Sequence, residues 1–110
     1  MDSEKALRLI GMALRARRLE VGFDAAMALT ASGRARLAVT ASDASPRVAS
    51  RIDDAAEQSG AAHIAAPFDK FQLGAALGRA ECAAVATADA GFSKAIIEAL
   101  NSEPGNTTRR

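Results

Sequence analysis

Residues 33–60, GRARLAVTASDASPRVASRIDDAAEQSG, decide the fold class because they join a glycine, a short strand, a turn and a helix without interruption. The apolar run at 36–41 has the length of a strand. The serines and the aspartate of the following turn, with Pro46 at a first helical position, are typical of a capped helix start. That helix is expected to reach about Ser59 and to stop at Gly60, since glycine readily takes the left-handed conformation that ends helices.

The same alternation of helix and strand continues on both sides of this segment. We expect helices that end near 17–18, at 33 and at 78, a last helix at 92–100, a short extended piece at 19–22, and buried strands at 61–66 and 82–87. Short connections between alternating elements predict an α/β protein, a three-layer α/β/α sandwich. We expect a single domain over residues 1–100, followed by a disordered tail at 101–110.

Composition narrows the classes of protein. The chain has 110 residues, enough for one domain, and 49% of them are hydrophobic, so a core can be buried. With 4 Phe and no Trp or Tyr, a platform of stacked aromatics for single-stranded nucleic acid is not expected. The N-terminus resembles no signal peptide, and no stretch approaches the ~20 apolar residues that span a bilayer. One cysteine excludes an internal disulfide. We therefore expect a cytoplasmic protein.

Residues suited to catalysis or metal binding are few. His63 and Cys82 are interpreted as strand residues, the first with a local hydrogen bond and the second as a small buried hydrophobe, rather than as metal ligands or a nucleophile–base pair. Glycines 74 and 78 lack the Lys-Ser/Thr of a phosphate loop, so they are interpreted as helix glycines that permit close packing. The acidic residues at 53–57 are interpreted as a solvated helix face rather than a catalytic pair. We expect no enzyme activity, cofactor, metal or small-molecule substrate.

The distribution of charge is informative. Residues 1–51 hold 9 Lys and Arg against 5 Asp and Glu, whereas residues 52–103 hold 3 against 8. The basic half predicts a surface suited to a polyanion, although unevenly distributed, solvated charge is the simpler alternative. Arg15, Arg17 and Arg18 lie where the first predicted helix meets the turn at Gly22, and two more arginines, at 34 and 36, lie where the second helix leads into its strand. Clustered in space, they would neutralise phosphates.

Three segments carry a family resemblance: LRLIGMALRARRLEVGFDAA (7–26), SGRARLAVTASDASP (32–46) and FQLGAALGRAECAAVATADAGFSKAI (71–96). Their order and spacing over nearly the whole chain resemble the superfamily of the kink-turn-binding ribosomal proteins L7Ae and L30e. The small bacterial YlxQ-type members are the most similar. The resemblance implies a mixed sheet of about four strands between helical layers, and it implies RNA binding.

The resemblance also implies where RNA is bound. In the family, the N-terminus of the second helix enters a kink-turn and reads its bases with a Gly-x-Asn-Glu-x-x-Lys motif, and a second loop packs on an extruded nucleotide. Here the motif falls on residues 22–28, where Asp24, Ala25 and Ala28 replace Asn, Glu and Lys. Ionised Asp only accepts hydrogen bonds, and Ala offers no polar group. We therefore expect contacts mainly to the RNA backbone rather than to bases.

The resulting candidate RNA-binding residues lie after the first helix, at the start and end of the second, and in the second loop. They are Arg17, Arg18, Gly22, Phe23, Asp24, Ala25, Ala28, Arg34, Arg36, Arg79, Ala80 and Glu81. The expected partner is structured RNA, with ribosomal RNA as the first candidate. The arginines are expected to meet at one end of the fold.

The alternative function is a protein-interaction module that has lost kink-turn recognition. Phe23 carries this alternative, because an aromatic side chain at the tip of the base-reading loop could anchor a protein partner. The same side chain could instead stack on an RNA base or pack into its own fold.

Overall fold

The computed structural model describes residues 2–101, and within them five helices surround a four-stranded sheet. The elements follow in the order α1 (Ser3–Arg15), β1 (Glu20–Val21), α2 (Phe23–Ala31), β2 (Leu37–Thr40), α3 (Pro46–Ser59), β3 (Ala62–Ala65), α4 (Lys70–Ala76), β4 (Ala84–Thr87) and α5 (Ala90–Asn101).

The sheet has the strand order β1-β4-β2-β3 and is mixed, as the resemblance implies. Strands β2 and β3 are parallel, whereas β4 runs antiparallel to both β1 and β2. Val39 of β2 pairs with Val85 of β4 on one side and with Ile64 of β3 on the other. Because β4 runs against its neighbours, the residue after β1 and the residue after β2 lie at the same end of the sheet, where β4 begins.

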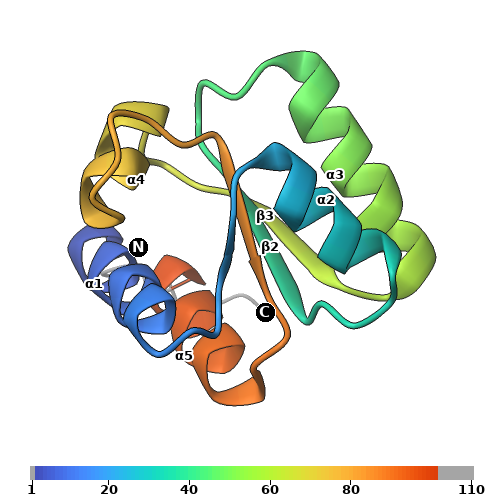
Figure 1. Cartoon of the computed structure of the whole chain (residues 1–110), viewed down its shortest axis with the longest axis horizontal. Helices are drawn as coiled ribbons and strands as arrows, with labels where there is room; N and C mark the ends of the chain where they lie inside the picture. Colours follow the sequence, from blue (N-terminus) through green and yellow to red (C-terminus); the bar gives the residue numbers. More distant parts are fainter. Residues whose placement is uncertain (1, 102–110) are drawn as a thin grey trace.

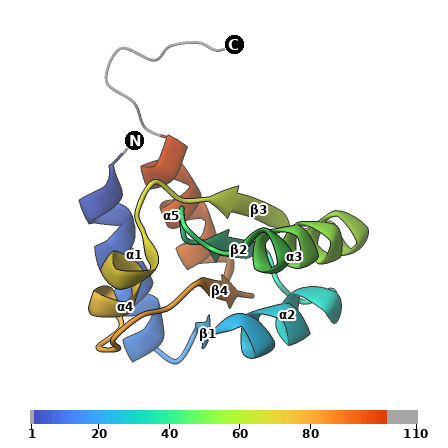
Figure 2. The same ribbon diagram turned by 90° about the horizontal axis from the view of Figure 1, so that it is seen from above.

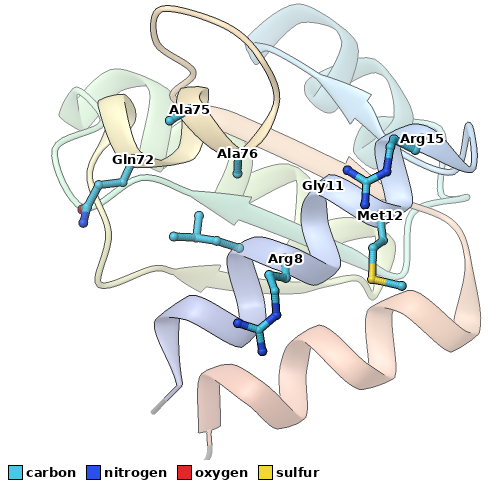
Figure 3. A pocket seen from close by; sticks show the side chains of 8 residues that line it. Arg8, Gly11, Met12, Arg15, Gln72, Ala75 and Ala76 are labelled. Carbon is cyan, nitrogen blue, oxygen red and sulfur yellow. The ribbon is translucent and has the colours of Figure 1, made fainter.

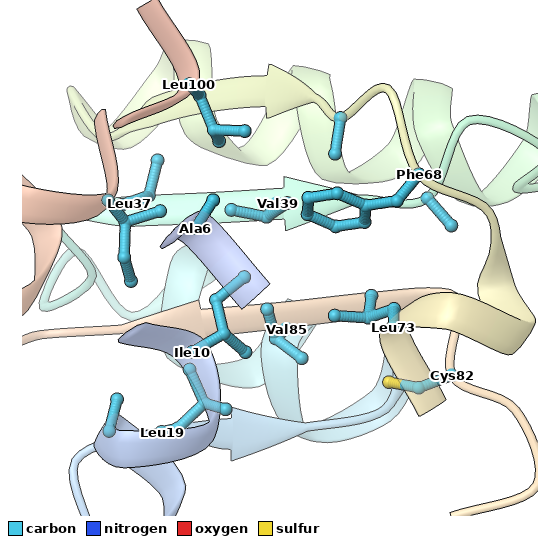
Figure 4. Close-up of a cluster of buried hydrophobic side chains, with 14 of the residues drawn as sticks. Ala6, Ile10, Leu19, Leu37, Val39, Phe68, Leu73, Cys82, Val85 and Leu100 are labelled. Atoms are coloured by element: carbon cyan, nitrogen blue, oxygen red, sulfur yellow. The ribbon is translucent and has the colours of Figure 1, made fainter. Parts of the chain in front are cut away.

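Helices cover both faces of the sheet, which confirms the three-layer α/β/α sandwich (Figures 1 and 2). Helices α1, α4 and α5 lie on one face, over a core that includes Ile10, Phe68 and Val85 (Figure 4). Helices α2 and α3 lie on the other, over a smaller core that includes Ala38 and Ile52. The second core is mostly alanine, so α2 and α3 pack closely on the sheet.

The local signals at α3 act as expected. The hydroxyl oxygen of Ser45 accepts a hydrogen bond from the backbone N–H of Val48 at 3.2 Å, and Pro46 is the first helical residue. The helix ends at Ser59, and Gly60 follows with φ +84°. Both ends of α3 therefore coincide with the capping signals in its sequence.

Two expectations are wrong in detail. The strand at 61–66 was expected to be buried, but β3 is an edge strand whose Ala62 and Ala65 are exposed, because it pairs with β2 alone in the described part of the chain. The tail was expected to begin at residue 101, but Asn101 is the last residue of α5. Residues 102–110 lie outside the described residues. No helix between residues 2 and 101 is long and apolar enough to cross a membrane.

Candidate nucleic-acid interface

The candidate residues fall at two opposite ends of the sheet. Gly22, at the end of β1, lies near the start of β4, since its backbone N–H donates to the carbonyl of Ala84 at 2.9 Å. Arg36, just before β2, lies near the end of β4, since its N–H donates to the carbonyl of Thr87 at 2.8 Å. We call these two places the α2 end and the arginine end. Helix α2 connects them, and its nine residues span roughly 13 Å.

At the α2 end, the helix begins with free backbone donors. Gly22 is the N-cap with φ +97°, a conformation that suits glycine, and it has no side chain to cap the helix. The first backbone hydrogen bond of α2 runs from Ala26 to the carbonyl of Gly22. The N–H groups of Phe23, Asp24 and Ala25 consequently have no acceptor within the described residues, and they point out of the helix start.

The second loop of the family pattern, residues 79–81, lies beside this helix start. Gly74 allows α4 to press against the loop, since a Cβ atom there would lie 2.6 Å from the Cα atom of Glu81. The N–H of Arg79 donates to the carbonyl of Gly74 at 2.9 Å. Close packing is the role expected for both Gly74 and Gly78, and the structure confirms it for Gly74 alone. Gly78 lies after the end of α4 with φ +71° and has no atom within 4 Å of an added Cβ, so it serves the turn rather than helix packing. The loop is held on α4, and its tip residue Ala80 is exposed.

A groove of about 440 Å³ joins the two features. Gly22 lines it from the helix start, and Arg79 and Glu81 line it from the loop. The sequence pattern did not single out Asp43 and Lys70, which line it as well. The carboxylate of Asp43 accepts the backbone N–H of Lys70 at 2.9 Å, so the turn before α3 is tied to the start of α4. In the sequence, the signal for this contact is the aspartate in the 42–46 turn, although the sequence pattern assigns it only to the capped helix start.

The charge of the α2 end is not that of a strong phosphate site. Asp24, Asp43 and Glu81 supply three carboxylates, whereas Lys70 and Arg79 supply two cations. The Nζ atom of Lys70 is 3.3 Å from Oε1 of Glu81, so that cation is already paired. In the described part of the chain Arg79 makes no ion pair, and it is exposed. The attraction for an anion at this end therefore depends on the backbone donors and on Arg79.

The arginine end is more basic. Arg17, Arg18 and Arg34 line a concavity of about 190 Å³, with Glu20 and Asp89 on its wall. Adding Arg36 gives four cations against two carboxylates, and these arginines are all exposed.

The turn that carries Arg17 and Arg18 is held in place. Arg17 has φ +61°, and the hydroxyl of Thr87 donates to the backbone carbonyl of Arg18. Nε of Arg18 is 3.8 Å from the Asp89 carboxylate, and the arginine side chain is 63% exposed. Its positive charge is therefore only weakly offset.

The expectation that all the arginines meet at one end is wrong for Arg79. The other four lie together, but Arg79 lies at the α2 end, on the opposite side of the sheet's length. The direction of α2 explains why Arg34 and Arg36 lie at the end opposite to Arg79. Helix α2 starts at one end and finishes at the other, so residues after it, such as Arg34, are carried away from the helix start.

The positions of the base-reading motif are accessible. Asp24 and Ala28 are exposed and lie one turn apart on α2, and Ala25 is half-buried. Phe23 is also half-buried and packs against the core between the sheet and α2 and α3. Of the three roles considered for Phe23, packing into its own fold is therefore the one seen here, and the side chain offers a partner only part of its surface.

The structure also contains a polar cluster that the sequence pattern missed. Nε2 of His63 lies 2.9 Å from the hydroxyl of Thr40, and Nδ1 lies 2.9 Å from a carboxylate oxygen of Asp53. A hydroxyl, an imidazole and a carboxylate in this order resemble a nucleophilic triad. Thr40 has no exposed surface, however, so no substrate can reach its hydroxyl. We interpret the cluster as structural, which agrees with the local hydrogen bond expected for His63.

The remaining candidates for chemistry are the single cysteine and possible metal ligands. Cys82 is buried, as expected, and its thiol donates to the carbonyl of Ala84 at 3.3 Å. Over residues 2–101, no group of three or more His, Cys, Asp or Glu side chains is arranged to hold a metal ion.

Comparison with known proteins places this geometry in a family. A solved structure from Bacillus halodurans, described as a protein with unknown function, is 26% identical, with a TM-score of 0.81; the match covers 89% of this chain and 98% of that one. The 15.5kD RNA binding protein of Giardia lamblia is 18% identical and has the same fold, with a TM-score of 0.68, over 89% of this chain and 83% of that one. No curated protein matches the chain. The family model described as "Ribosomal protein L7Ae/L30e/S12e/Gadd45 family" matches residues 4–97, which include the α2 start, the 79–81 loop and both ends of the sheet, and the chain therefore belongs to that family.

Proposed function

We propose that this protein is a non-catalytic RNA-binding protein that binds structured RNA, with ribosomal RNA as the first candidate. The observation that carries the proposal is the start of α2, where three backbone N–H groups without acceptors among the described residues lie beside a groove lined by Arg79. Such a helix start favours a phosphate group, because its donors and its dipole both point at the ligand. Membership of a family named after ribosomal proteins and the shared fold of an RNA binding protein support it.

The proposed contacts are mainly to the RNA backbone. Asp24, Ala25 and Ala28 lack the donors and the positive charge of the kink-turn motif that the resemblance implies. Asp24 and Glu81 also repel phosphates. Affinity at the α2 end then comes from backbone N–H groups and Arg79, which carry little sequence information.

The arginine end supplies the second part of the proposal. Arg17, Arg18, Arg34 and Arg36 give this end a formal charge of about +2 after Glu20 and Asp89 are counted. We therefore assign most of the salt-dependent attraction for RNA to the arginine end. The α2 end contributes mainly backbone hydrogen-bond donors. An RNA that contacts both ends must follow α2 for roughly 13 Å, which is longer than a single nucleotide.

Titration of the purified protein with a kink-turn RNA and with ribosomal RNA tests the proposal. We expect binding to both that weakens steeply between low and physiological salt, with little preference for the kink-turn. Absence of salt-sensitive binding to both RNAs would refute RNA binding as the function.

The alternative proposal is a protein-interaction module on the same fold. Phe23 supports it less than the sequence indicated, because part of its ring packs against the core. A pull-down with and without nuclease separates the two functions. A partner that is retained after nuclease treatment supports a protein-interaction module, whereas a partner that is released was bridged by RNA.

A further inference from the structure

A groove of about 570 Å³ runs between α1 and α4, and none of its lining residues also lines the groove of the α2 end or the concavity of the arginine end (Figure 3). Leu7 and Met12 of α1 and Ala75 and Ala76 of α4 form its apolar surface. None of the twelve candidate RNA-binding residues lines it. The groove therefore needs an explanation of its own.

Small residues produce the groove. A Cβ atom at Gly11 would lie 3.0 Å from the carbonyl oxygen of Ala76, so the two helices approach closely at this point. The alanines of α4 are too short to cover the larger side chains of α1 on either side. Met12 is left 46% exposed as a result.

A further exposed apolar side chain lies on α4, outside the residues that line the groove. Phe71 is 59% exposed and lies one helical turn before Ala75, on the same side of the helix. Among residues 2–101, Met12 and Phe71 are the exposed large hydrophobic side chains, and they belong to the two helices that form this groove. Methionine, aromatic residues and arginine are the types enriched in the centres of protein interfaces.

The charged residues of the groove indicate which kind of partner it would bind. Arg8 and Arg15 line it, both exposed, and neither makes an ion pair within the described residues. They are seven residues apart on α1, so their backbone positions are separated by roughly 10 Å along the helix. No carboxylate of residues 2–101 lines the groove. An occupant with apolar side chains between two negative charges complements it.

We propose that the α1–α4 groove binds an acidic amphipathic helix of a partner protein. The apolar face of that helix packs on Leu7, Met12 and the adjoining surface of α4, in the helix-in-groove mode. Two carboxylates two turns apart on the partner pair with Arg8 and Arg15. The apolar lining favours a protein over RNA, since phosphates would use the arginines and leave Leu7 and Met12 without a function. This inference is independent of the proposed RNA function.

Synthetic helical peptides of about four turns provide the probe. The acidic peptides carry two Glu seven residues apart with Leu or Phe between them, and matched basic peptides carry Lys in place of Glu. We expect the acidic peptides to shift the backbone NMR signals of Gly11, Gln72 and Ala75, and the basic peptides to leave them unchanged. Met12→Ser should weaken binding of the acidic peptides.

Reversing the charges of Arg8 and Arg15 tests whether these two residues determine the peptide preference. Arg8→Glu with Arg15→Glu should lower the affinity for the acidic peptides about tenfold and confer binding of the basic ones. The matched control is Arg47→Glu with Arg51→Glu on α3, which changes the net charge equally on the other face of the sheet and should alter neither affinity. Circular dichroism verifies that each variant is folded.

The proposal is overturned if no acidic peptide shifts these signals, or if the Arg8/Arg15 swap leaves the peptide preference unchanged. It is also overturned if RNA shifts the same signals and displaces the peptides, which would make the groove an RNA contact. RNA titrations of the same samples keep the two proposals separate, because peptide binding is expected whether or not RNA binds at the sheet ends.

Discussion

His63 on the edge strand β3 is hydrogen-bonded to the hydroxyl of Thr40 on β2 at 2.9 Å, and this bond gives the edge strand a polar tie to the centre of the sheet. Thr40 has no exposed surface, whereas the side chain of His63 is 10% exposed. Water has little access to either side chain, so each depends on the other for this hydrogen bond. A buried donor or acceptor that is left without its partner destabilises a fold by about 1–3 kcal/mol.

We therefore expect His63→Ala to lower the free energy of unfolding by about 1–3 kcal/mol, because the Thr40 hydroxyl is left without its side-chain partner. Urea unfolding measures the change. Asp53→Asn is the matched control, since this carboxylate is 64% exposed and its removal should change the free energy by no more than about 1 kcal/mol.

A double-mutant cycle with Thr40→Val then isolates the bond itself. The two substitutions should be less destabilising together than the sum of their separate effects. Additive effects would show that the bond between His63 and Thr40 contributes nothing to stability.

Gly74→Ala tests the packing of the 79–81 loop on α4. The new Cβ atom would lie 2.6 Å from the Cα atom of Glu81, closer than real Cβ atoms approach their neighbours, so the loop must move. We expect about 1–3 kcal/mol of destabilisation, as for other overpacked sites, and shifted NMR signals at Arg79 and Glu81.

Gly91→Ala is the control for this substitution. It also adds a methyl group to a helical glycine, but its nearest neighbour is Oδ1 of Asp89 at 3.3 Å. This oxygen accepts the N–H of Phe92 at 2.8 Å, and a shift of a few tenths of an ångström relieves the contact. Alanine favours helix, so a neutral or slightly stabilising effect is expected. Equal destabilisation by the two substitutions would contradict a tight approach specific to Gly74.

Much of the fold was predictable because its signals are local. Ser45, Pro46 and Gly60 act on the helix they flank, and the structure places the ends of α3 accordingly. The exposure of β3 was not predictable in this way. Its apolar sequence resembles that of the central strands, and whether a strand is buried depends on how many neighbours it has.

The candidate site was predictable only in part, for a related reason. The family resemblance implied that Arg34 and Arg36 lie near Arg17 and Arg18, and the structure agrees. The separation of Arg79 from them depends on the direction of β4 against β2, which no local pattern encodes. The cluster around the imidazole of β3 was missed because its members come from three different elements, β2, α3 and β3.

The different charges of the two ends predict different salt dependences. Arg34→Gln with Arg36→Gln should weaken RNA binding and reduce the slope of log affinity against log salt by about 0.7–0.9 for each phosphate that is no longer neutralised. Fluorescence anisotropy with ribosomal RNA at several salt concentrations measures the slope. Arg47→Gln with Arg51→Gln, on the exposed side of α3, removes the same charge as a control. If both pairs change the slope equally, the attraction comes from net charge rather than from the arginine end.

Restoring the replaced side chains of α2 should restore base recognition. Asp24→Asn, Ala25→Glu and Ala28→Lys together place the residue types of the kink-turn motif on a helix start where positions 24 and 28 are exposed. The triple variant gains donors to bases and removes the phosphate repulsion of Asp24. We expect the affinity for a kink-turn RNA to rise at least about tenfold, while the affinity for a duplex of the same length changes far less. Fluorescence anisotropy with the two RNAs measures both affinities.

Ala28→Lys alone is the control for added charge in this experiment, and it should raise the affinities for the kink-turn and the duplex alike, because a single cation attracts any phosphate backbone. Gly22 and Arg79, which line one groove beside the helix start, are unchanged in both variants. A triple variant that binds the two RNAs equally would show that the α2 end does not hold RNA in the kink-turn orientation. The replaced side chains would then be a consequence of a different binding mode rather than the cause of weak base recognition.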